Sequence, residues 1–112
     1  MDACDEVRLT ELASTLGRDG MNELTKLFLR ESRLRVQRLR QAAGSPTIIR
    51  AEAHQLHGAG AAIGAIGLAK LAEQLGTAAR AGDADCVLVL TNGVGTELDR
   101  VADFLQHWAL PE

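Results

Sequence analysis

Residues 45–63 read SPTIIRAEAHQLHGAGAAI, and this stretch predicts an amphipathic helix. Ser45 is suited to cap the helix, and Pro46 fits its first position, where the missing N–H group costs nothing. Small and apolar residues then recur at the spacing i, i+4, i+7, i+11 and i+14, which places them on one face. The members of this predicted buried stripe are Ile49, Ala53, Leu56, Gly60 and Ile63. We therefore expect a helix over about 46–63.

The chain before this helix predicts two more. A short amphipathic helix is expected over about 5–16, and Gly17 ends it. Residues 18–20 are expected to form a connector, in which Asp19 would cap the following helix. A long helix is then expected over about 20–43, with apolar residues at helical spacing on one face. These residues are Leu24, Phe28, Val36, Leu39 and Ala43.

The chain after it predicts a further pair of helices. The first is expected over about 67–81, and Gly82 follows where a left-handed residue commonly ends a helix. Asp83 is placed to cap the last helix, over about 84–109. Its apolar residues repeat every seven positions, which is typical of a bundle seam. The repeat consists of Val87, Val94, Val101 and Trp108.

Composition supports an all-α fold in a single domain covering 1–112. Ala and Leu are the most frequent residues, whereas Phe, Trp and Tyr together make up 3% of the chain. This composition favours helices over strands. Short connectors make successive helices antiparallel. We expect an up-down four-helix bundle with a short extra helix at the N-terminus.

Charge and residue usage exclude several classes of protein. A net charge of −3 is unlike the basic surface of a nucleic-acid-binding domain. The sequence has no apolar run of about 18 residues, so we expect no membrane association. The acidic N-terminus lacks the apolar core of a secretion signal, which favours a cytoplasmic location. Met1 and the N-terminal helix favour a free-standing protein, and we expect it to be a monomer.

Among three histidines, His54 has the most informative surroundings. It lies outside the buried stripe, on a face that also carries Arg50, His57, Gly58 and Ala61. Gly58 costs helix stability and has no packing role on that face. Its lack of a side chain leaves open space beside the imidazole. This space is suited to a phosphoryl group or to the backbone of a partner.

The string AHQLHGAG at residues 53–60 resembles the signature of histidine-containing phosphotransfer (HPt) domains. Gly64 follows at the spacing of that signature, and a leucine-patterned helix with Leu68, Leu71 and Leu75 comes next. The resemblance covers about 20–108, nearly the whole chain.

The resemblance implies a four-helix bundle without catalytic machinery of its own, a phosphotransfer intermediate rather than a kinase. His54 would accept a phosphoryl group from an aspartyl phosphate on a response-regulator receiver domain and pass it to another receiver. A hybrid sensor kinase would be a further partner. The chain itself would bind no cofactor, since Mg²⁺ would belong to the receiver.

Two positions depart from the family pattern. His57 stands where the family usually has Lys, and imidazole is only partly protonated near neutral pH. Gly76 stands where the family often has Glu or Gln. We expect Arg50 or Arg80 to supply the missing charge and polarity near His54.

Two alternatives follow from these departures and from the histidine spacing. A degenerate family member would dock to a receiver without taking up phosphate, as His57 in the Lys position suggests. His54 and His57, three residues apart on a helix, could instead ligate a metal or haem in a bundle. The metal or haem hypothesis lacks further ligands, because no carboxylate shares the helix face of His54 and His57, and Glu52 points elsewhere.

Overall fold

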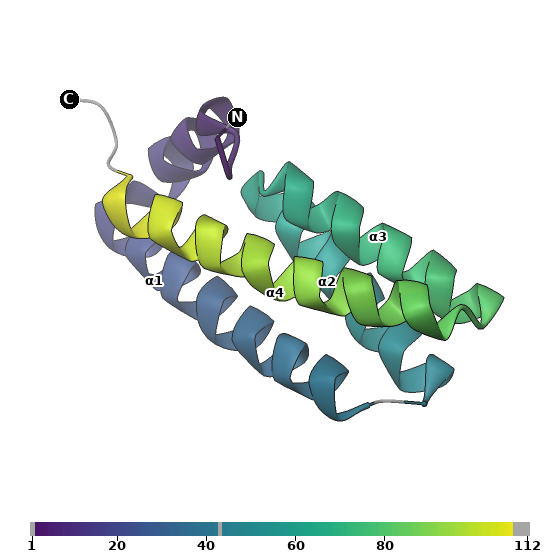
Figure 1. The fold of residues 1–112 in the computed structure, drawn as a ribbon. Helices are drawn as coiled ribbons and strands as arrows, with labels where there is room; N and C mark the ends of the chain where they lie inside the picture. Colours follow the sequence, from purple (N-terminus) through teal and green to yellow (C-terminus); the bar gives the residue numbers. More distant parts are fainter. Residues whose placement is uncertain (1, 43, 109–112) are drawn as a thin grey trace.

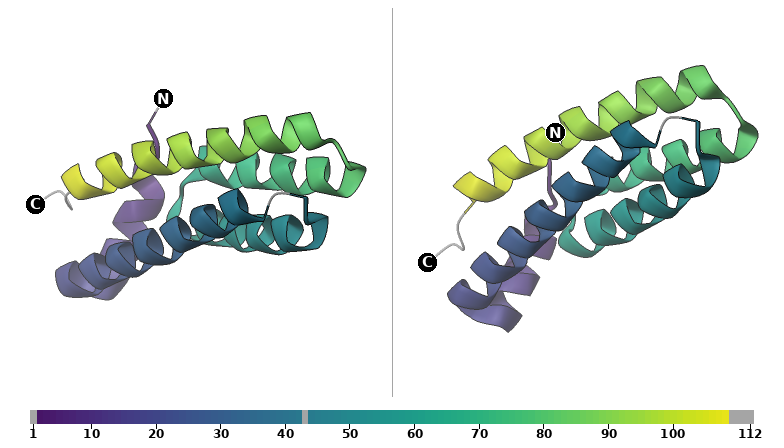
Figure 2. Two further views of the ribbon diagram at one scale, coloured as in Figure 1. Left: turned by 60° about the horizontal axis from the view of Figure 1, so that its bottom comes forward. Right: turned by 90° about the horizontal axis from the view of Figure 1, so that it is seen from below.

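A computed structural model describes residues 2–42 and 44–108, and every regular element within them is an α-helix. The helices are α1 (Glu6–Gln41), α2 (Pro46–Ile63), α3 (Ile66–Ala81) and α4 (Ala84–His107). Helix α1 packs against α2 and α4, and α3 packs against the same two helices. Successive helices reverse direction (Figures 1 and 2). The predicted all-α class is confirmed. Within the described residues no helix has the length and apolarity needed to span a membrane.

Helix α1 consists of two helical segments that join at Gly17. This glycine has φ 76° and ψ 176°, a backbone conformation that favours glycine. Figure 1 shows the first segment turned away from the long second one. The predicted break at Gly17 is therefore present, but the predicted connector over 18–20 is wrong. One residue suffices to turn the chain, so Asp19 lies inside the second segment instead of capping it.

Helix α2 has the predicted bounds. Ser45 Oγ accepts a hydrogen bond from the Ile48 N–H over 3.5 Å, and Pro46 occupies the first turn. At the other end Gly64 adopts a left-handed conformation with φ 83°. Both ends therefore follow from residue types that the sequence shows directly.

The remaining helix ends lie within two residues of the prediction. Helix α3 begins one residue early, and Gly82 ends it with φ 72°. The Asp83 side chain caps α4 by accepting from the Cys86 N–H over 3.0 Å. Helix α1 ends at Gln41 and α4 at His107, both two residues before the predicted ends. Ala43 and residue 109, at those predicted ends, lie outside the described residues.

The predicted stripe on α2 is buried along its whole length. Gly60 belongs to it for a steric reason: a Cβ atom there would lie 3.3 Å from both the Ala65 carbonyl oxygen and the Ala69 nitrogen. The stripe faces the core, which the other helices complete, so His54 lies on the outer side of α2. The buried members are Ile49, Ala53, Leu56, Gly60 and Ile63.

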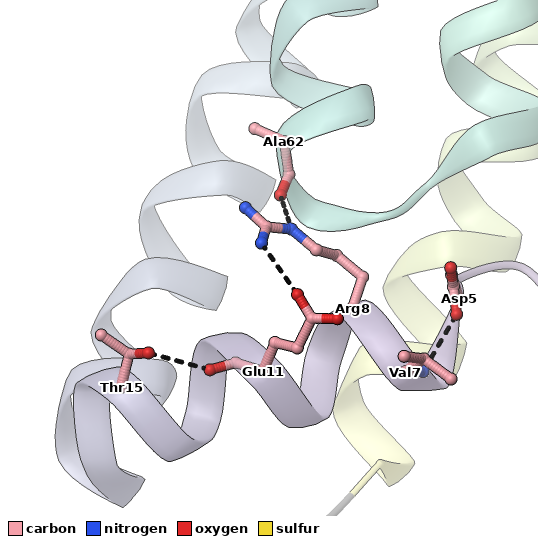
Figure 3. Close-up of polar contacts among 6 residues, drawn as sticks. All are labelled: Asp5, Val7, Arg8, Glu11, Thr15 and Ala62. Carbon is pink, nitrogen blue, oxygen red and sulfur yellow. Dashed lines mark hydrogen bonds and ion pairs between the residues drawn. The ribbon is translucent and has the colours of Figure 1, made fainter.

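The first segment of α1 is fastened to the C-terminal end of α2. Arg8 Nε donates a hydrogen bond to the Ala62 carbonyl oxygen over 3.1 Å (Figure 3). The Asp5 N–H donates to the Gly64 carbonyl oxygen over 2.8 Å. The Asp5 carboxylate also caps the segment by accepting from the Val7 N–H (Figure 3). These contacts fix the N-terminal segment beside the helix that carries His54.

Candidate functional site

His54 is exposed on the outer side of α2, as predicted. Its neighbours on the inner side, Ala53 and Leu56, are at most 1% exposed. The imidazole lines two separate hollows of the surface, one on each side of α2. His54 is therefore accessible from two directions with different surroundings.

The first hollow is a groove of about 570 Å³ between α2 and α3, which we call the basic groove. Three basic or titratable side chains, Arg50, His57 and Arg80, line it together with His54. Glu73 is the acidic residue among those that line it. The structure thus brings together four of the five residues predicted for the site. The complete lining is Thr47, Arg50, Ala51, Ala53, His54, His57, Ala72, Glu73, Gly76, Thr77 and Arg80.

Gly76 lies on the α3 wall of the basic groove. A Cβ atom at this position would be 3.8 Å from the Ala53 Cβ, an ordinary van der Waals contact. Packing therefore does not require glycine here. The groove is wider at this point than it would be with a Glu or Gln side chain.

The second hollow, of about 530 Å³, lies between α1 and α2, and we call it the apolar hollow. Gly58 belongs to this side: it is exposed, and no described atom would lie within 4 Å of a Cβ atom there. The open space predicted beside His54 is therefore present. The lining is largely apolar and includes Leu12, Leu24, Leu27, Phe28, Ala59 and Ala62.

Two arginines, Arg8 and Arg35, also line the apolar hollow. An apolar patch with arginines around it is typical of a surface that binds a transient partner. Arg8 and Leu12 contribute to this patch from the first segment of α1, and the sequence did not predict their contribution. The leucine spacing of that segment indicates a helix, but it does not show which neighbour the helix contacts.

His57 is held more firmly than a surface side chain. Its Nδ1 lies 3.0 Å from the Ala69 carbonyl oxygen on α3 and 3.9 Å from a Glu73 carboxylate oxygen. A carbonyl oxygen only accepts hydrogen bonds, so Nδ1 must carry the proton. The side chain is 41% exposed. His57 is therefore a link between α2 and α3 as well as part of the groove wall.

Glu52 points away from the two histidines, as predicted. Its carboxylate accepts a hydrogen bond from Arg35 on α1 over 3.0 Å and lies 3.7 Å from Arg38. Within the described part of the chain, no three His, Cys, Asp or Glu side chains gather in a way that could hold a metal ion.

Comparison with known proteins adds a sequence match and a structural match. Residues 23–104 match the profile of the Hpt domain family. The fold is similar to the crystal structure of histidine-containing phosphotransfer protein B (HptB) from Pseudomonas aeruginosa PAO1, with a TM-score of 0.87 and 25% sequence identity. The alignment covers 93% of this chain and 91% of that one. No curated protein sequence matches this chain.

Proposed function

This chain belongs to the Hpt domain family, and we propose that His54 is the residue on which it carries a phosphoryl group. Its function is histidine phosphotransfer in a phosphorelay, in which Hpt domains act with receiver domains. The observation that carries the assignment to His54 is its exposed imidazole between a basic groove and an apolar hollow.

The transfer step needs little from this chain beyond a positioned nucleophile. A neutral ring nitrogen of His54 attacks the phosphorus of an aspartyl phosphate on the receiver. A P–N bond forms, the P–O bond to the aspartyl group breaks, and the carboxylate leaves with the electron pair. The proton on the other ring nitrogen stays on the imidazole. Phosphoryl transfer passes through a loose transition state, so its catalysis consists mainly of positioning the reactants and neutralising charge.

The basic groove is suited to neutralise charge on the transferred group. Arg50 and Arg80 are permanently charged and line the groove beside His54. Their positive charge favours phosphoryl oxygens and disfavours a divalent cation. This supports our proposal that Mg²⁺ is held by the receiver and that the chain uses no cofactor.

The apolar hollow is suited to contact the receiver. It lies directly beside His54, and its apolar lining with two arginines is typical of a transient interface. A monomer leaves this surface open to successive partners, including the receiver of a hybrid sensor kinase. The reversal of successive helices and the turn at Gly17 support an up-down antiparallel bundle with a short N-terminal helix (Figure 1).

We also place the protein in the cytoplasm, where thiols stay reduced. Cys4 is buried and Cys86 is exposed, and both are free. This location agrees with a relay that uses receiver domains.

The test is incubation of the chain with phosphorylated receivers, with wild type compared to His54→Gln. His107→Gln is the matched control, because His107 is an exposed histidine on α4, away from both hollows. We expect acid-labile, base-stable phosphate on wild type and on the control, and none on His54→Gln. Equal labelling of His54→Gln would reject the assignment. Receiver binding without phosphate uptake by wild type would select a docking-only protein instead.

A further inference from the structure

We propose that His57 makes the phosphorylated state of His54 depend on pH, by presenting a protonatable ring nitrogen to the phosphoryl group in the basic groove. The inference rests on the function proposed above and adds a proton-dependent role for a second histidine.

The geometry assigns different tasks to the two ring nitrogens of His57. Nδ1 donates to the Ala69 carbonyl oxygen over 3.0 Å, and it does so whether the ring is neutral or charged. Proton gain and loss therefore occur at Nε2. The ring is fastened to α3 on its Nδ1 side, yet its side chain is 41% exposed and lines the groove. Protonation of Nε2 thus changes the charge of the groove without a movement of the ring.

The other charged and titratable groups of the groove come from the same two helices. Arg50 and His54 belong to α2, whereas Glu73 and Arg80 belong to α3; among the described residues, no side chain of α1 or α4 lines the groove. The two arginines keep their charge at all relevant pH values. Glu73 is the acidic side chain of the lining, and one of its carboxylate oxygens lies 3.9 Å from His57 Nδ1. Imidazole is the side chain whose ordinary chemistry provides a proton switch near neutral pH, and His54 and His57 are the two imidazoles that line the groove.

The protonation state of Nε2 decides how the groove receives phosphoryl oxygens. A neutral Nε2 presents a lone pair and offers no hydrogen bond to an anionic oxygen. A protonated Nε2 presents an N–H group and a positive charge, which together form a charge-assisted hydrogen bond. Phosphorylation of His54 therefore favours proton uptake at His57 Nε2. The phosphorylated state gains stability as the pH falls and loses that gain as the pH rises.

The experiment measures the equilibrium constant for phosphoryl transfer from a phosphorylated receiver at pH values from about 5.5 to 8.5. Wild type is compared with His57→Lys, which keeps a positive charge, and with His57→Gln, which has none. The receiver is the same in all three measurements, so its own titration cancels in the ratios of the equilibrium constants. Wild type should match His57→Lys at the acidic end. At the alkaline end it should approach His57→Gln, about two- to fivefold lower, the effect of a partly exposed charge pair.

The outcomes distinguish a failure of the inference about His57 from a failure of the proposed function. A constant ratio of wild type to His57→Lys across the pH range, with transfer intact, overturns the role of His57 and leaves His54 as the acceptor. Absence of transfer to wild type removes the basis of both. If a substitution disturbs the fold, nitrogen NMR of the wild-type protein decides. The Nε2 resonance of His57 should titrate at higher pH after phosphorylation, and an unchanged titration contradicts the inference.

Discussion

Arg35 on α1 donates a hydrogen bond to Glu52 on α2 over 3.0 Å, and this ion pair joins the two helices that enclose the apolar hollow. The two side chains are only 23% and 14% exposed. Arg38 lies 3.7 Å from the other carboxylate oxygen but is 54% exposed. The Glu52 carboxylate thus has a close partner that is mostly buried, Arg35, and a second partner that is farther away and more exposed, Arg38.

This difference predicts unequal effects of two arginine substitutions. Arg35→Ala should lower the free energy of unfolding by about 1–2 kcal/mol, because it leaves a largely buried carboxylate without its close hydrogen bond. Arg38→Ala, the matched control, should change it by less than about 0.5 kcal/mol, as exposed pairs usually do. Urea denaturation measures both values. Equal losses of unfolding free energy in the two variants would show that the short Arg35–Glu52 contact contributes no more than the longer Arg38–Glu52 contact.

Gly58 and Gly60 predict opposite effects of the same substitution. A methyl group at Gly60 would press on backbone atoms of Ala65 and Ala69 at 3.3 Å, so Gly60→Ala should push α2 and α3 apart. This steric cost exceeds the gain in helix propensity, so we expect the free energy of unfolding to fall by roughly 1 kcal/mol. Gly58→Ala adds a methyl group in open space and should stabilise the protein by about 0.5–1 kcal/mol. Thermal denaturation of both variants checks the signs, and a stabilised Gly60→Ala protein would contradict the close packing.

Leu27 and Leu34 provide a test of the docking surface. Both lie on α1 and are similarly exposed, 47% and 41%, but only Leu27 lines the apolar hollow. Leu27→Gln should slow transfer from a phosphorylated receiver about five- to tenfold, the effect of losing one well-placed interface residue. Leu34→Gln should leave the rate unchanged. Single-turnover transfer kinetics measure both rates, and a similar loss in the two variants would place the receiver elsewhere.

Cys4 predicts a loss of stability in alkaline solution. Burial, with a smaller contribution from Glu97, raises the pKa of the Cys4 thiol from 9.0 to about 11. Because the folded-state pKa is the higher one, this thiol stabilises the fold below about pH 9, and the contribution is lost as the pH rises towards 11. The free energy of unfolding of wild type should therefore fall more steeply over this range than that of Cys4→Ala. Parallel pH curves for the two proteins would contradict the raised pKa.

The local signals for helix ends were sufficient to predict much of the fold. Ser45, Pro46 and Asp83 act at helix starts because a capping side chain or a missing N–H group has its effect within one turn. Gly82 acts at a helix end through its own backbone conformation. The exposure of His54 followed from helix periodicity, which places it opposite the buried Leu56. These features depend on residues close together in the sequence.

Features that depend on distant residues were not predicted. The spacing around Gly17 indicated a break, but a turn made by one residue could not be told from a longer connector. The hydrogen bond from Arg8 to Ala62 joins residues 54 positions apart, and no local pattern indicates it. The bond between His57 and Ala69 likewise depends on how closely α3 approaches α2, which Gly60 permits.

The position of His54 between two hollows has an evolutionary consequence. Residues that would govern the chemistry of the transferred group lie on α3 and one flank of α2, whereas residues that would govern partner choice lie on α1 and the other flank. Mutations can therefore accumulate on one side while selection preserves the other. After gene duplication, changes on α1 could alter which receiver a copy binds while the residues around the transferred phosphoryl group stay the same.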